Sequence, residues 1–102
     1  MKYMLVLQWP ASSIKDYDDM VAFENSLTDP LEDFAEIDGH DAGSGEVIIF
    51  IRTNDPERAF LQIKTIVGSK DFIIGLKAAY RQLTGDEYTI LWPKGLKKFT
   101  VK

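Results

Sequence analysis

The stretch Val47-Ile48-Ile49-Phe50-Ile51 decides the fold prediction, because it is the purest apolar run in the chain. A run of β-branched and aromatic residues predicts a β-strand, and its lack of polar residues predicts a strand covered on both faces. Residues 3–9 form a second near-continuous apolar run, which Pro10 ends. We interpret these two runs as the central pair of strands in one sheet.

The segments around the two runs predict the remaining elements. Apolar residues recur with helical spacing over residues 14–27 and again over residues 56–67. Asp55 and Pro56 are a strong start for the second helix, as N-cap and first helical residue. The other expected elements are a strand beginning at 34–37, a short helical turn at 70–74, a strand or a helix at 76–83 with strand preferred, and a strand at 88–92.

This order predicts an α+β fold, a ferredoxin-like β-α-β-β-α-β sandwich with an additional C-terminal strand. The sheet is expected to be antiparallel with both helices on one face. Its other face would be an open apolar surface, which predicts a homodimer, unless the final hairpin covers that face. The 102 residues are expected to form a single domain, 1–102, with a basic tail at 93–102.

Charge is distributed unevenly along the chain. The segment from Lys15 to Glu46 holds eleven acidic residues and one base, whereas the rest holds eleven bases and five acids. An acidic surface of this kind repels phosphate, so we do not expect nucleic-acid binding. It is either a solubilising face or a docking surface for a basic partner.

Residues 38–46 contain the one polar cluster that we single out. The stretch holds three glycines and two aspartates, which is typical of a hairpin. His40 is the only histidine, and imidazole is the commonest general base. Asp38, Asp41 and Glu46 are near enough in sequence to join it in a ligand or metal site, although a twisted or bulged hairpin without chemistry explains the same residues.

The same segment carries a resemblance. The run Asp38-Gly39-His40-Asp41-x-Gly43-Ser44-Gly45-Glu46 precedes an apolar strand, and Asn54-Asp55-Pro56 and Tyr88-Thr89-Ile90-Leu91-Trp92-Pro93 follow. This arrangement resembles a group of small uncharacterised bacterial proteins of about this length. The resemblance covers most of the chain and implies a bacterial single-domain protein without implying an activity.

Several classes of function are excluded or left without a signal. The chain has no cysteine, so disulfides, thiolate metal sites and cysteine catalysis are excluded. No apolar stretch is long enough for a membrane span, and we interpret residues 1–7 as part of a strand and not as a leader. No motif for a cofactor is present, and we expect a cytoplasmic protein.

We therefore predict a non-enzymatic acidic interaction domain, of inhibitor or immunity type, that docks on a basic partner. Two alternatives stay open: a dimeric small-ligand or metal-binding module with its site near His40, and a small enzyme using His40 as base. The candidate partner- or ligand-binding residues are Asp16, Asp18, Asp19, Asp38, His40, Asp41 and Glu46. We assign no catalytic residue and no metal ligand.

Overall fold

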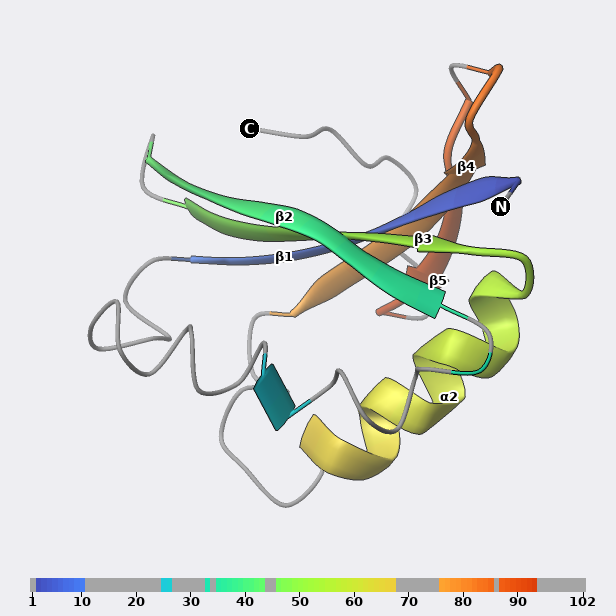
Figure 1. Ribbon diagram of the computed structural model, residues 1–102. Helices are drawn as coiled ribbons and strands as arrows, with labels where there is room; N and C mark the ends of the chain where they lie inside the picture. The colour runs from blue at the N-terminus through green and yellow to red at the C-terminus, as the bar shows by residue number, and fades with distance from the viewer. Residues whose placement is uncertain are drawn as a thin grey trace.

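The computed structural model describes residues 2–10, 25–26, 33, 35–43, 46–67, 76–85 and 87–93 (Figure 1). In this part of the chain, five antiparallel strands form one sheet in the order β2-β3-β1-β4-β5. The elements are β1 (Tyr3–Pro10), β2 (Ala35–Gly43), β3 (Glu46–Thr53), α2 (Pro56–Val67), β4 (Lys77–Gln82) and β5 (Thr89–Trp92). The α+β class and the antiparallel sheet are confirmed.

The two apolar runs occupy the interior of the sheet, as predicted. β1 pairs with β3 on one side and with β4 on the other, and β3 lies between β1 and β2. Side chains of β1 alternate between two apolar clusters. Leu5 and Leu7 face the cluster that contains α2, whereas Met4 and Val6 belong to a cluster on the opposite face. A strand buried on both faces needs apolar residues at nearly every position, which explains the unbroken run.

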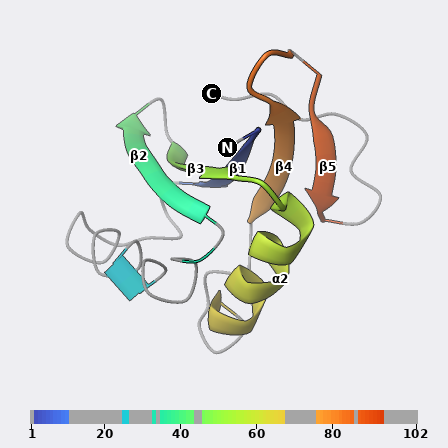
Figure 2. The same ribbon diagram turned by 45° about the vertical axis from the view of Figure 1, so that its right-hand side comes forward.

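Helix α2 packs on one face of the sheet (Figure 2). It begins where predicted, because the Asp55 side chain caps its first turn: the Arg58 backbone N–H donates to Asp55 Oδ1 at 3.1 Å. The Thr53 hydroxyl in turn accepts a hydrogen bond from the Asp55 backbone N–H at 3.0 Å. Ala59 and Ile63 are fully buried against the strands, so the cap and the apolar stripe together position the helix.

The face opposite α2 differs from the expected open surface. Four apolar residues at its centre are already buried within the single chain, with Val6 and Ala79 fully buried, Ile48 2% exposed and Met4 9% exposed. Partly buried aromatic and aliphatic side chains pack against them, Tyr88 among them. The homodimer was predicted because this face was expected to be exposed. Since the centre of the face is buried, the homodimer stays a prediction that exposure no longer supports.

Other predictions are settled in part. The segment 76–83, for which strand and helix were both open, forms β4, and the predicted last strand is β5. Residues 38–43, predicted as hairpin loop, belong to β2, because the ladder with β3 continues as far as the Gly43–Glu46 pair. The helix predicted at 14–27 lies outside the described residues except for Asn25 and Ser26, which are helical. The turn at 70–74 and the tail beyond residue 93 also lie outside them.

A tight turn follows β4 at residues 82–85. The Gly85 backbone N–H donates to the Gln82 carbonyl at 3.0 Å, and the Arg81 guanidinium donates to three carbonyl oxygens, those of Gln82, Leu83 and Gly85. One arginine thus satisfies three carbonyl acceptors at this turn. Of the helical segments that the structure describes, none combines the length and apolar character that crossing a membrane requires.

Candidate functional site

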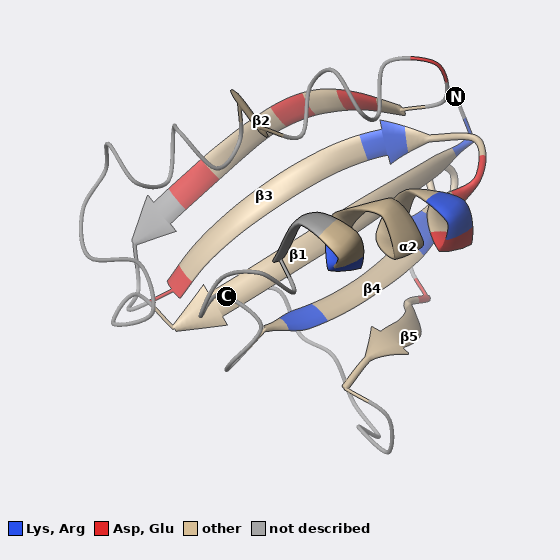
Figure 3. Cartoon of the chain, turned by 90° about the horizontal axis from the view of Figure 1, so that it is seen from below, with Lys and Arg blue, Asp and Glu red and all other residues tan. Residues whose placement is uncertain are grey.

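Four carboxylates lie along one edge of the sheet. Glu36, Asp38 and Asp41 belong to β2, which is the outermost strand of the described sheet on that side, and Glu46 opens β3 (Figure 3). Asp41 is exposed, and the Glu36 side chain is 59% exposed. With Arg52 as its one cation, the β2–β3 hairpin has a net charge of −3. We call these four carboxylates the acidic edge.

Arg52 ties two of the four carboxylates to β3. Its Nη2 donates a hydrogen bond to Glu36 Oε1 at 3.2 Å, across a directly paired position of the ladder. Its Nε lies 3.2 Å from Asp38 Oδ1, but the atom is buried and has no hydrogen-bond partner among the described residues. The contact with Asp38 is therefore an ion pair without hydrogen-bond alignment. Asp41 and Glu46 have no ion pair with another described residue.

A β-bulge in β2 gathers the carboxylates on one face. Ile37 and Gly39 lie opposite successive residues of β3, so Asp38 between them is the extra residue. Side chains alternate strictly along a regular strand, and one extra residue reverses the alternation beyond it. Glu36 before the bulge pairs with Arg52, and Asp41 after it pairs with Ile48. Arg52 and Ile48 are four positions apart on β3 and point to the same face, so Glu36 and Asp41 share that face. This is the face opposite α2.

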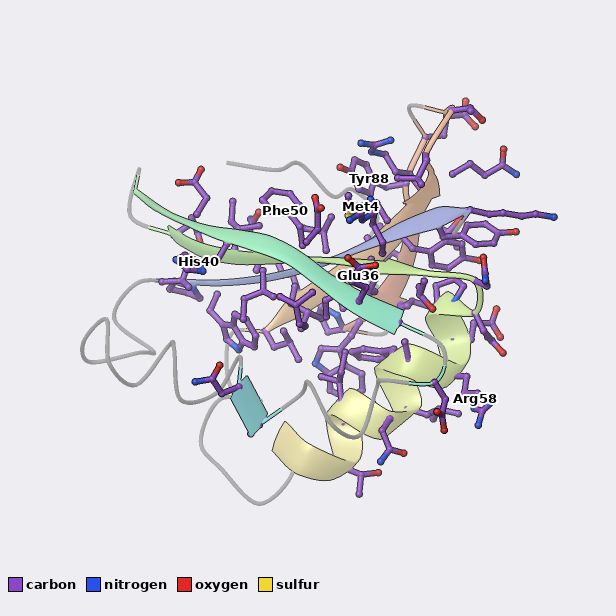
Figure 4. All side chains as sticks on the ribbon, viewed as in Figure 1. Met4, Glu36, His40, Phe50, Arg58 and Tyr88 are labelled. Atoms are coloured by element: carbon purple, nitrogen blue, oxygen red, sulfur yellow. The ribbon has the colours of Figure 1, made fainter. Side chains whose placement is uncertain are left out.

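The bulge also separates His40 from the acids predicted to join it. His40 pairs with Ile49, whose side chain belongs to the cluster that contains α2. His40 therefore points to the α2 side, whereas Asp41 points to the other side. Figure 4 shows His40 and Phe50 on opposite sides of the sheet. The structure does not bring together the predicted constellation of His40 with Asp41 and Glu46.

This arrangement separates His40 from the acids on which the predicted metal-binding and enzymatic alternatives depended. Metal sites and general bases both need several polar groups that converge on one point. Within the described ranges, no group of three or more His, Asp or Glu side chains could hold a metal ion. Three further acids of the predicted surface, Asp16, Asp18 and Asp19, lie outside the described residues.

A second feature is a hollow of about 500 Å³ on the α2 side, at the end of the sheet where β1 begins and β4 ends. Two tyrosines of neighbouring strands, Tyr3 and Tyr80, form one part of its wall. No sequence motif marks it, because its residues come from three strands and their neighbourhood depends on strand register. In the sequence, only the two tyrosines themselves could have indicated a binding site there.

Comparison with protein-family models gave no match, and comparisons with curated proteins and with solved structures gave none either. The resemblance to small bacterial proteins therefore stays a prediction.

Proposed function

We propose that this chain is a non-enzymatic interaction domain, of inhibitor or immunity type, whose acidic edge docks on a basic protein partner. The observation that carries the proposal is the gathering of Glu36, Asp38 and Asp41 on one face of an outermost strand. The bulge is needed for this gathering, since a regular strand would place Asp41 on the other face. Asp16, Asp18 and Asp19 would extend the surface from the predicted first helix.

The ion pairs of Arg52 divide the acidic edge into two parts. Glu36 and Asp38 share the charge of Arg52, so they are partly neutralised within the chain. Asp41 and Glu46 lie nearer the turn of the hairpin and share no such cation among the described residues. We therefore assign the strongest attraction for a basic partner to Asp41 and Glu46. Complementary charges of this kind mainly raise the rate of association and its specificity.

The fold proposal is compatible with this role. We propose a ferredoxin-like fold for a bacterial, cytoplasmic protein, with the helix predicted at 14–27 beside α2. The order β2-β3-β1-β4 supports it, because the β-α-β-β-α-β arrangement requires the first and third strands at the centre. The fold alone implies no activity, so the function rests on the acidic edge.

A pull-down at low salt from a lysate of the cells that naturally produce the protein tests the proposal. The wild-type chain should retain a basic protein that a high-salt wash releases, because salt screens attraction between exposed charges. The double variant Asp41→Asn, Glu46→Gln should lose most of this retention. The matched control is Glu57→Gln, Glu87→Gln, which removes the same charge at exposed positions away from the acidic edge.

Two results would contradict the proposal. If both double variants lost retention to the same extent, the net charge of the chain, and not the acidic edge, would be what attracts the protein. If no basic protein were retained and released by salt, docking would be contradicted. The carboxylates of the acidic edge would then serve to prevent edge-to-edge strand pairing. In that case the Asp41→Asn, Glu46→Gln variant should self-associate more than its control, which light scattering measures.

A further inference from the structure

The hollow on the α2 side of the sheet is independent of the acidic edge and suggests a second function. Its volume of about 500 Å³ falls within the range of roughly 300–1,000 Å³ for small-molecule sites. It lies at the end of the sheet where β1 begins and β4 ends. The lining residues are Tyr3, Tyr80, Arg81, Gln82, Gly85, Glu87 and Thr89.

Two tyrosine rings form an aromatic corner in this hollow. The ring centroids of Tyr3 and Tyr80 are 5.6 Å apart, and the ring planes meet at 86°. The position is defined by the sheet: Tyr80 pairs with Leu5, Tyr3 lies two residues from Leu5 on the same face, and Thr89 pairs with Tyr80. Perpendicular rings present an electron-rich face beside a ring edge, and the faces of tyrosine rings attract cations.

The charged side chains at the hollow differ in how they are held: Arg81 is hydrogen-bonded to the backbone, whereas Glu87 is exposed. Arg81 Nη1 donates to three carbonyl oxygens of the turn that follows β4, which fixes the position of this positive charge without neutralising it. Glu87 is exposed, and it is the only carboxylate among the described lining residues. Lys2 lines an adjoining hollow that shares Tyr3 and Gln82. Two tyrosines and an exposed carboxylate thus line the same hollow, and tyrosine ring faces and carboxylates both attract an ammonium group.

We propose that this hollow binds the ammonium group of a small organic cation. The ring face that the tyrosine pair presents to the hollow contacts the cation, and Glu87 supplies the opposite charge. Gln82 and Thr89 add polar groups for the rest of the ligand. The proposal does not rest on the function assigned to the acidic edge, since the two features share no residue.

Titration calorimetry with choline as the probe tests the proposal, with 3,3-dimethyl-1-butanol as the uncharged molecule of the same shape. Choline should bind, and the alcohol should bind at least about tenfold more weakly, because it has no charge for the rings and the carboxylate. Acetate serves as the anionic probe and should not compete. Equal binding of choline and the alcohol, no binding of choline, or competition by acetate would each overturn the proposal.

Variants then assign the binding to named residues. Glu87→Gln should weaken choline binding about fivefold or more, whereas Glu57→Gln, an equal charge change on α2, should leave it unchanged. Tyr80→Phe keeps the ring and should retain binding, and Tyr80→Leu should lose it. Circular dichroism confirms folding of each variant. Unchanged binding in both Glu87→Gln and Tyr80→Leu would mean that choline binds elsewhere, which would contradict the proposal.

Discussion

Arg52 is the residue that makes a strand as acidic as β2 compatible with the sheet. Like charges on one strand repel one another, and an edge strand has a partner on one side only. The guanidinium contacts Glu36 and Asp38 from the neighbouring strand, and the Arg52 side chain is 41% exposed. Such partly exposed contacts contribute little individually, but one arginine here serves two carboxylates. Its effect on stability should therefore exceed that of an isolated surface pair.

Replacement of this arginine gives the prediction at the residue scale. Arg52→Gln should lower the free energy of unfolding by about 1 kcal/mol at low salt, and by less at high salt, because exposed charges are screened. Urea denaturation measures the change. Lys77→Gln, the same charge change on β4, is the control and should have little effect.

A double-mutant cycle isolates the ion pair itself. Glu36→Gln in the wild-type background should be destabilising, but in the Arg52→Gln background it should be neutral or stabilising, because the remaining carboxylates repel one another. Additive effects of the two substitutions would show that Arg52 acts through packing of its aliphatic stem and not through its charge.

At the scale of elements, the sequence predicts the strands better than the faces they present. The interior positions of β1 and β3 followed from their apolar residues, since only a strand covered on both sides requires such a run. The faces of β2 did not follow, because strict alternation groups His40 with Glu36 and separates both from Asp41. One extra residue, Asp38, reverses that grouping. The glycine-rich run at 38–45 is compatible with a bulged hairpin but does not specify which residue is the extra one, and the register that brings Tyr3 beside Tyr80 has no local signature.

Helix α2 shows the opposite case, because residues next to one another in the sequence were sufficient to predict where it begins. The Asp55 side chain accepts a hydrogen bond from the Arg58 backbone N–H. Pro56 is the first helical residue, and its lack of an N–H costs nothing there because the helix does not use the N–H at that position. Asp55→Ala should lower the free energy of unfolding by about 1 kcal/mol, the usual cost of losing such a cap. Asp55→Ser keeps an acceptor and should recover most of the loss. Thermal or urea unfolding measures both, and equal stability of the two variants would show that the cap contributes nothing.

At the scale of the whole molecule, the sheet has an apolar cluster on each face. On the α2 side, Ala59 and Ile63 of the helix complete the cluster. On the opposite side, Val6 and Ala79 are fully buried by residues of the same chain. Charge also differs across the described sheet, since the acidic edge lies on β2 and at the start of β3, whereas Lys77 and Arg81 lie on β4.

The burial of Val6 leads to a prediction about assembly. If the face opposite α2 is completed within one chain, the midpoint of thermal unfolding should not depend on protein concentration over about a hundredfold range. Val6→Ala should then lower the free energy of unfolding by roughly 2 kcal/mol at every concentration, because a buried side chain is truncated. If two chains instead associate through this face, the midpoint should rise with concentration, and Val6→Ala should shift the chain toward the monomer in light scattering. That second result would restore the homodimer predicted from the sequence, and it would place the acidic edge at the rim of a larger interface.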